Sequence, residues 1–206
     1  MSMPQATRNR LLLSAIAVLF FAPLLLAVLM QSQWWNFEPG TTTNLGKLLD
    51  PPVALDAAAL RESLAAAGNA TEDGRATWLM LYVFPGDCAQ GCQDDVSGLR
   101  QAHLALGRHR EAATVALLSS RPIDAATRAQ LQKIYPGFAI IRDDWDTLRA
   151  GLAEAVQRIW PGTSDPEDHA FLIDPQGHII LAYAPGFDPN HVYQDLRHLL
   201  RYASRD

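Results

Sequence analysis

Two cysteines, Cys88 and Cys92, are the residues of this 206-residue chain whose type and spacing most directly suggest chemistry. They are the only cysteines in the sequence, too few to staple a disulfide-rich fold but enough to form one site. They follow an apolar segment that ends at Phe84, and we expect a helix to begin at about Cys88 with Asp87 as its cap. Helix positions four apart have Cβ atoms about 5–6 Å apart, so both sulfurs could share a metal ion or, with adjustment, form a disulfide.

The position of the cysteine pair leaves several kinds of chemistry open. The amino end of a helix carries partial positive charge, which favours thiolate over thiol and therefore favours both nucleophilic attack and metal ligation. Two thiolates suit a soft ion such as Cu(I). A static disulfide and two buried thiols are the unreactive alternatives. Burial as apolar residues is disfavoured by the polar neighbours Asp87, Gln90, Gln93 and Asp94.

A third metal ligand would come from the six histidines of the chain. His169 is the strongest candidate, because it begins a predicted strand after the polar segment 162–168, and a loop there can approach the cysteine-bearing helix end. His103 falls on the apolar stripe of its helix and is expected to be packed. His109 is expected in a loop, and His191 and His198 at solvated or capping positions on the last helix. His178 begins the second hairpin strand and could point outward.

The segments around these residues alternate between strands and helices. Apolar runs predict buried strands at 77–84 and 113–118, and helical periodicity predicts helices at 88–106, 125–134, 146–160 and 190–203. Two strand-like runs, 169–174 and 178–183, are joined by Pro175, Gln176 and Gly177 and predict a β-hairpin. Strand–helix–strand units imply parallel strands, and the hairpin adds antiparallel ones. We therefore predict an α/β fold with a mixed sheet flanked by helices.

The amino-terminal part of the chain has a different character. Residues 11–30 are uncharged and apolar, and at about 1.5 Å per residue they would span a hydrocarbon core of roughly 30 Å, so they predict a transmembrane helix. Arg8 and Arg10 precede this run, which predicts a cytoplasmic amino terminus and an outer location for the rest. A cleaved secretory signal is the alternative. The run is longer than a typical signal core, and no A-x-A pattern follows it.

These segments divide the chain into four expected parts. They are a cytoplasmic amino terminus at 1–10, the transmembrane helix at 11–30, a linker and amino-terminal extension at 31–75, and the folded domain at 76–206. Within the extension we expect a linker or irregular strand at 36–52 and a short helix at 56–68. The formal net charge of −5, without a long basic run, argues against nucleic-acid binding.

Taken together, three motifs and the expected membrane anchor resemble the Sco/SenC family of cytochrome oxidase assembly proteins, part of the thioredoxin-like superfamily. The motifs are C-x-x-x-C at Cys88 to Cys92, a histidine before a strand that ends in Asp-Pro-x-Gly (His169, then Asp174 to Gly177), and an S-x-x-P-x-D-like segment at Ser119 to Asp124. The resemblance covers roughly residues 76–203. The chain lacks the prolines that usually flank the family's cysteines, so it looks like a divergent branch.

The resemblance implies a fold, a site and a partner. It implies a thioredoxin-like periplasmic domain, anchored in the inner (plasma) membrane and its lipid bilayer. It also implies copper binding by Cys88, Cys92 and His169, and copper delivery to, or thiol reduction of, the CuA site of cytochrome c oxidase subunit II. Two alternative functions stay open: a thiol-disulfide oxidoreductase in which Cys88 attacks and Cys92 resolves, and an assembly scaffold with a structural disulfide.

Overall fold

The computed structural model describes residues 14–23, 43–68, 77–141 and 145–203. The chain divides into two units, Met1–Thr42 and Thr43–Asp206. In the first unit, residues 14–23 are helical, and the other residues of the predicted transmembrane segment 11–30 lie outside the described residues. Across the described part of the chain, no helix combines the length and the apolar character needed to cross a membrane.

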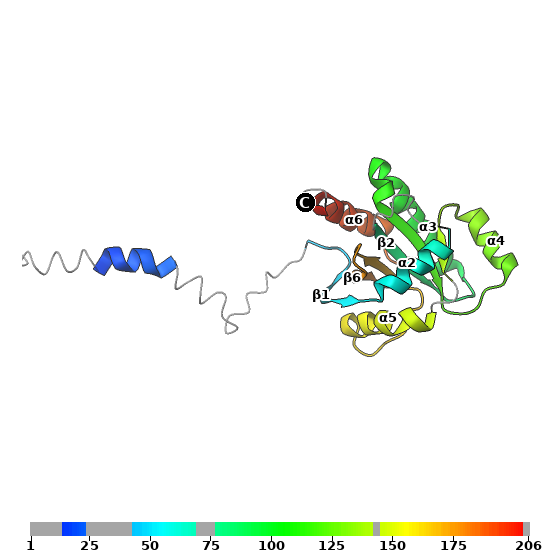
Figure 1. Ribbon diagram of the computed structural model, residues 1–206, viewed down its shortest axis with the longest axis horizontal. Helices are drawn as coiled ribbons and strands as arrows, with labels where there is room; N and C mark the ends of the chain where they lie inside the picture. Colours follow the sequence, from blue (N-terminus) through cyan, green and yellow to red (C-terminus); the bar gives the residue numbers. More distant parts are fainter. Residues whose placement is uncertain (1–13, 24–42, 69–76, 142–144, 204–206) are drawn as a thin grey trace, which may run out of the picture. The chain divides into compact units, whose positions relative to one another are not determined.

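The second unit is built on one six-stranded mixed sheet (Figure 1). Its strands are β1 (Lys47–Ala54), β2 (Trp78–Phe84), β3 (Ala113–Ser119), β4 (Ala139–Ile141), β5 (Ala170–Ile173) and β6 (His178–Tyr183). They lie in the order β1-β6-β5-β2-β3-β4. The pairs β2–β3 and β3–β4 are parallel, whereas β2–β5, β5–β6 and β6–β1 are antiparallel. The predicted mixed sheet is confirmed.

Helices cover both faces of this sheet. They are α2 (Ala57–Ala66), α3 (Gln90–Ala105), α4 (Ala125–Ile134), α5 (Trp145–Ile159) and α6 (Pro189–Ala203), with a short 3-10 helix η1 (Gly107–Ala112). Figure 1 shows α3 and α6 on one side of the sheet and α5 on the other. Each side of the sheet has its own hydrophobic core. Val96 of α3 and Leu196 of α6 belong to one core, on the side we call the α3 face. Leu148 and Leu152 of α5 belong to the other core, on the side we call the α5 face.

Strand β2 explains why both faces are buried. Its continuous apolar sequence predicts a strand covered on both sides. Met80, Tyr82 and Phe84 belong to the core of the α3 face, and the alternate residues Leu79, Leu81 and Val83 belong to that of the α5 face. Successive side chains of a strand point to opposite faces, so neighbouring residues can serve different cores.

The helix and turn signals of the sequence are largely confirmed. Asp124 caps α4, because its carboxylate accepts a hydrogen bond from Thr127 N at 2.6 Å. Gly177 lies in the hairpin between β5 and β6 with a φ of 93°, a conformation that glycine adopts without a steric penalty. The helix expected near residues 56–68 is present as α2, and Asp56 caps it.

Strand β1 overlaps the segment 36–52, for which the sequence predicts either a linker or an irregular strand. It contains Pro51 and Pro52, and its pairing with β6 shifts register between Leu48 and Val53. Proline cannot donate a ladder hydrogen bond and is therefore tolerated mainly on edge strands, which is where β1 lies. The compact unit consequently begins at Thr43 and uses part of the segment expected to be a linker.

Candidate functional site

Cys88 and Cys92 form a disulfide at the point where β2 leads into α3. Their Cα atoms are 5.2 Å apart, within the normal range for a bridge. Cys88 lies in the connecting loop and is partly exposed, whereas Cys92 lies in the first turn of α3 and is 6% exposed. Of the two sulfurs, Cys88 is therefore the more accessible to another molecule.

The start of α3 differs from the sequence prediction. The helix begins at Gln90 and its N-cap residue is Ala89, which makes no side-chain capping bond. Asp87 is therefore not the cap. It is exposed, 4.0 Å from the guanidinium of Arg121. An uncapped first turn leaves backbone N–H groups free to stabilise a negative charge. The Gln93 side chain donates to the carbonyl of Cys88 at 3.0 Å and holds the loop against the helix.

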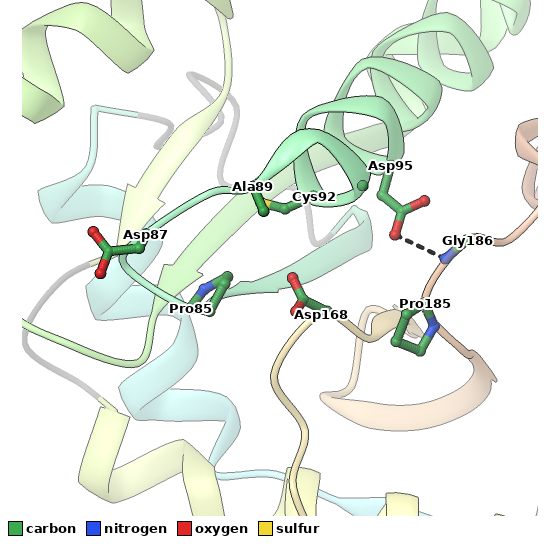
Figure 2. A pocket seen from close by; sticks show the side chains of 9 residues that line it. Pro85, Asp87, Ala89, Cys92, Asp95, Asp168, Pro185 and Gly186 are labelled. Atoms are coloured by element: carbon green, nitrogen blue, oxygen red, sulfur yellow. Dashed lines mark hydrogen bonds between the residues drawn. The ribbon is translucent and has the colours of Figure 1, made fainter.

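A cavity of about 200 Å³ opens beside Cys92. Its lining includes Gly91 and Cys92 from the first turn of α3, Asp95 from the next turn, Asp168, and Gly186 from the loop after β6. Figure 2 shows the Asp95 carboxylate turned toward Gly186 and Asp87 on the opposite side of Cys92. The carboxylates of Asp87, Asp95 and Asp168 thus line one small cavity together with buried Cys92.

Asp95 is a buried carboxylate with few hydrogen-bond donors. It is 5% exposed, and it accepts a hydrogen bond from Gly186 N at 3.0 Å (Figure 2). Burial raises the pKa of Asp95, and the negative charges of Asp168 and Asp94 raise it further, whereas the Gly186 N–H opposes the shift. Its side chain therefore binds a proton more readily than an exposed aspartate does.

Asp168 is the second carboxylate of the cavity, and the backbone fixes its position. Its φ of 60° makes it the one non-glycine residue with a positive φ in the described part of the chain. Its N–H donates to Val83 O at 3.0 Å, and Tyr82 Oη donates to its carboxylate at 3.0 Å. Tyr82 is fully buried, and burial followed by the nearby carboxylates raises its pKa, so it remains a neutral donor.

The structure does not bring His169 to the cysteines. The ring of His169 packs against Trp160 and Phe171, with centroid distances of 5.1 Å and 6.4 Å, and both belong to the α5 face. Cys92 belongs to the α3 face. The Nδ1–H of His169 donates to Glu167 O at 2.8 Å. The preceding residue, Asp168, lines the cavity beside Cys92 instead.

The structure therefore does not bring the three predicted copper ligands together. Cys88 and Cys92 are joined in a disulfide, and the ring of His169 packs against side chains of the α5 face. Within the described residues there is no group of three His, Cys, Asp or Glu side chains placed to hold a metal ion. The carboxylates beside Cys92 are hard oxygen ligands, which suit Cu(I) poorly.

His103 is a packed residue, as expected. Its Nε2 lies 2.9 Å from Ala113 O and 3.2 Å from Arg110 O, and burial lowers its pKa. His178 pairs with Asp174 across the hairpin, with 3.0 Å between Nδ1 and Oδ2. These contacts give both histidines structural roles in the fold.

Sequence reasoning missed Asp95 and assigned no role to Asp168 beyond its place in the polar segment 162–168. A signal for Asp95 was present, because it lies three residues after Cys92, on the side of α3 that buries Val96 and Leu99. A carboxylate on an apolar stripe is unusual unless it is paired or functional. Asp168 has no comparable signal, since its orientation depends on a backbone conformation that the sequence does not reveal.

Comparison with known protein families assigns the folded domain to one of them. The family model described as "Transmembrane-like, thioredoxin-like, C-terminal domain" matches residues 78–203. The chain belongs to this family. The thioredoxin-like part of the sequence prediction is thereby confirmed, whereas the family match does not extend to the Sco/SenC assignment. A comparison with curated proteins found no match.

Solved structures similar to this chain include both copper-binding and redox proteins. Yeast Sco1 with copper bound is 14% identical over 66% of this chain and 82% of its own, with a TM-score of 0.46. Bradyrhizobium japonicum ScoI with copper bound is 14% identical over 60% and 85%, with a TM-score of 0.42. The thioredoxin domain of a thiol-disulfide oxidoreductase from Bacteroides vulgatus is 16% identical over 62% and 81%, with a TM-score of 0.40. These likenesses assign no function to the chain.

Proposed function

We propose that Cys88 and Cys92 are the redox centre of a thiol-disulfide oxidoreductase. The observation that carries the proposal is the disulfide between a partly exposed Cys88 and a buried Cys92 at the uncapped start of α3. A reactive cysteine needs access and an electropositive environment, and the amino end of a helix supplies the second. Membership in a thioredoxin-like family supports the same chemistry.

The two sulfurs take different roles in this mechanism. In the reduced protein the Cys88 thiolate attacks a disulfide of the partner, which forms a mixed disulfide and releases one partner thiol. Cys92 then attacks the sulfur of Cys88, forms the intramolecular disulfide and releases the second partner thiol. The reverse sequence oxidises a partner dithiol. Cys88 is the attacking residue because it is the more accessible sulfur and lies outside the helix.

We also propose the location and partner of this activity. The apolar segment 11–30, preceded by Arg8 and Arg10, would anchor the protein in the inner membrane with its domain on the periplasmic side. The partner we propose is the CuA site of cytochrome c oxidase subunit II, whose cysteines must be reduced before copper binds. The Sco/SenC resemblance of the motifs supports this partner. Copper delivery by the chain itself is less favoured, because His169 does not face the cysteines.

A redox titration of the full-length protein in detergent tests the oxidoreductase activity. Equilibration with glutathione buffers should give a potential in the range of thiol-exchange proteins, about −270 to −120 mV, rather than below about −300 mV as in structural disulfides. Cys92→Ser should trap a mixed disulfide with a partner, whereas Cys88→Ser should trap none. A potential below −300 mV would identify the bridge as structural.

A test in cells addresses the partner. Cells that carry Cys88→Ser/Cys92→Ser should lose oxidase activity if the pair reduces the CuA cysteines, and an added thiol reductant should restore it. His169→Ala serves as the matched variant for copper. Under the thiol proposal, cells with His169→Ala should keep their oxidase activity. Loss of oxidase activity in this variant, with restoration by added copper, would favour copper delivery instead. Full oxidase activity without both cysteines would favour a scaffold.

A further inference from the structure

A groove of about 400 Å³ lies between α6 and the chain that enters β1. Figure 1 shows α6 and the start of β1 side by side. Thr43 and Leu45 line one side of the groove, and residues of α6 between Asn190 and Arg201 line the other. We call it the α6 groove. It shares no lining residue with the cavity beside Cys92, so it is a separate candidate site.

Positively charged and hydrogen-bonding side chains dominate the α6 groove. Arg197 and Arg201 lie one helical turn apart, with His198 between them in the sequence, and Asn190 and Gln194 add amide groups. Like charges four residues apart on a helix repel each other, and an anion bound between them would offset that repulsion. The planar guanidinium group matches the oxygens of a phosphate group, to which it can donate two hydrogen bonds.

The acidic residue of the α6 groove is turned away from a ligand. Asp195 is 3% exposed, and its carboxylate accepts hydrogen bonds from two backbone N–H groups of the chain entering β1 and from Tyr183 Oη. Arg197, in contrast, is exposed, and its guanidinium carbon lies 5.9 Å from the centroid of the Tyr193 ring. A guanidinium over an aromatic ring still donates hydrogen bonds in its own plane, so Arg197 can bind an anion from this position.

We propose that the α6 groove binds the phosphate of an anionic phospholipid headgroup and so docks the domain on the membrane surface. This inference rests on the membrane location proposed above and extends it. Residues 31–42, twelve in all, connect the predicted transmembrane segment to Thr43 at the groove. A connection of this length spans at most about 45 Å. The α6 groove is therefore built where the chain from the proposed anchor joins the domain, and it stays within reach of the bilayer.

Leu45 favours a lipid surface over a soluble anion as the occupant. Its side chain is 46% exposed although it lines the groove, and its N–H is held by Asp195. An exposed leucine beside arginines is typical of surfaces that lie in a membrane interface, where the apolar side chain enters the acyl boundary and the guanidinium groups bind phosphates. A free phosphate ion would gain nothing from Leu45.

The overall charge of the chain makes the position of the two arginines important. The formal net charge is −5, so an anionic lipid surface repels much of the protein. Arg197 and Arg201 place two positive charges in one groove, and this groove is therefore the side that an anionic surface attracts. Helix α6 follows the loop that carries Gly186, which lines the cavity beside Cys92. Docking through α6 would thus fix how the disulfide is presented to partners in the same membrane.

Arginine-specific modification of the full-length protein in nanodiscs tests the proposal. Phenylglyoxal reacts with accessible guanidinium groups, and peptide mass spectrometry measures the rate at each arginine. Nanodiscs of phosphatidylcholine alone are compared with nanodiscs of an equal mixture of phosphatidylcholine and phosphatidylglycerol. Arg197 and Arg201 should react at least about fivefold more slowly in the anionic nanodiscs. Arg100, which is exposed on α3, should react at the same rate in both.

A pair of variants separates binding in the α6 groove from general charge attraction. In Arg197→Gln, the protection of Arg201 by phosphatidylglycerol should fall about fivefold, because one guanidinium holds the phosphate in place of two. Arg100→Gln is the matched control, since it removes the same charge from an exposed position outside the groove. It should leave the protection of Arg197 and Arg201 unchanged. Equal loss of protection in both variants would overturn the site.

The remaining outcomes distinguish the occupants. Equal reaction rates of Arg197 and Arg201 in the two kinds of nanodisc would overturn lipid binding. Protection in phosphatidylcholine nanodiscs by inorganic phosphate, as strong as that by phosphatidylglycerol, would assign the α6 groove to a soluble anion instead. Protection by polyglutamate but not by phosphatidylglycerol would assign it to an acidic protein segment. Release of the protein from cell membranes by alkaline carbonate would instead refute the proposed membrane anchor itself.

Discussion

Two buried aspartates of the α3–α6 layer, Asp195 and Asp95, have similar exposure but very different partners. Asp195 on α6 is 3% exposed and Asp95 on α3 is 5% exposed. Asp195 accepts hydrogen bonds from Leu45 N at 3.0 Å, Gly46 N at 2.7 Å and Tyr183 Oη at 2.8 Å. Asp95 accepts one, from Gly186 N at 3.0 Å, and has two carboxylates as neighbours.

The difference shows that partners, more than burial, decide what a buried carboxylate does. A carboxylate that accepts several hydrogen bonds fixes the elements that donate to it. Asp195 thereby ties the start of the compact unit to α6. Asp95 accepts one hydrogen bond and lines a cavity, and burial together with neighbouring negative charges raises its pKa.

The largest expected effect is the loss of stability on removing the carboxylate of Asp195. Asp195→Ala should lower the free energy of unfolding by about 3–5 kcal/mol, because it leaves two backbone N–H groups and the Tyr183 hydroxyl unsatisfied. Urea unfolding of the full-length protein in detergent measures the change. The exposed Asp94→Ala should cost less than about 0.5 kcal/mol, and comparable losses for both would show that Asp195 is not an anchor.

Gly46→Ala should disturb the same cluster without altering Asp195. A Cβ at Gly46 would lie 2.5 Å from the ring of Tyr183, which is 4% exposed and has no room to move. We expect a loss of about 1–3 kcal/mol in unfolding free energy. Gly91→Ala is the control, because nothing lies within 4 Å of its Cβ position, and it should be neutral or slightly stabilising. Equal stability of the two variants would contradict the close packing described.

A pair of tyrosine variants compares Asp195 with Asp168, the carboxylate that shares a cavity with Asp95. Tyr183→Phe removes a donor from buried Asp195 and should cost about 1–2 kcal/mol in unfolding free energy. Tyr82→Phe removes a donor from the partly exposed Asp168 and should cost less, because water can hydrogen-bond to that carboxylate instead. Thermal unfolding measures both changes. A larger loss for Tyr82→Phe would contradict the distinction between the anchoring cluster at Asp195 and the cavity beside Cys92.

The smallest expected stability effect has the opposite sign. The pKa of Asp95 is raised in the folded protein, so the stability it contributes is present below the unfolded pKa near 3.8 and is lost as pH rises through the folded value. Asp95→Asn cannot titrate and so does not lose this stability as pH rises. The unfolding free energy of Asp95→Asn minus that of the natural protein should therefore increase between the unfolded and the folded pKa of Asp95 and stay level at higher pH. A decrease with rising pH, in urea titrations, would show that Asp95 is stabilised as a charge.

Much of the fold could be predicted from the sequence because buried strands and capped helices leave strong local patterns. The apolar run at β2, the capping aspartate before α4 and the glycine of the β5–β6 hairpin each act through neighbouring residues. Strand β1 was less evident, since its two prolines are tolerated only because of its edge position. Edge position is a property of the assembled sheet.

The candidate site could be predicted only in part. The cysteine pair was recognisable from spacing, and the disulfide was one of the alternatives considered. In the structure Asp168, and not His169, lines the cavity beside Cys92, and the Tyr82 hydroxyl donates to its carboxylate. Local composition does not reveal this placement, so His169, the more familiar metal ligand, was selected and Asp168 was not.

The positive φ at Asp168 also limits which residues this position can accept. A φ of 60° lies in the left-handed region, which aspartate and asparagine adopt more readily than β-branched residues do. Asp168→Val would therefore strain the backbone just before β5 as well as remove a carboxylate from the cavity.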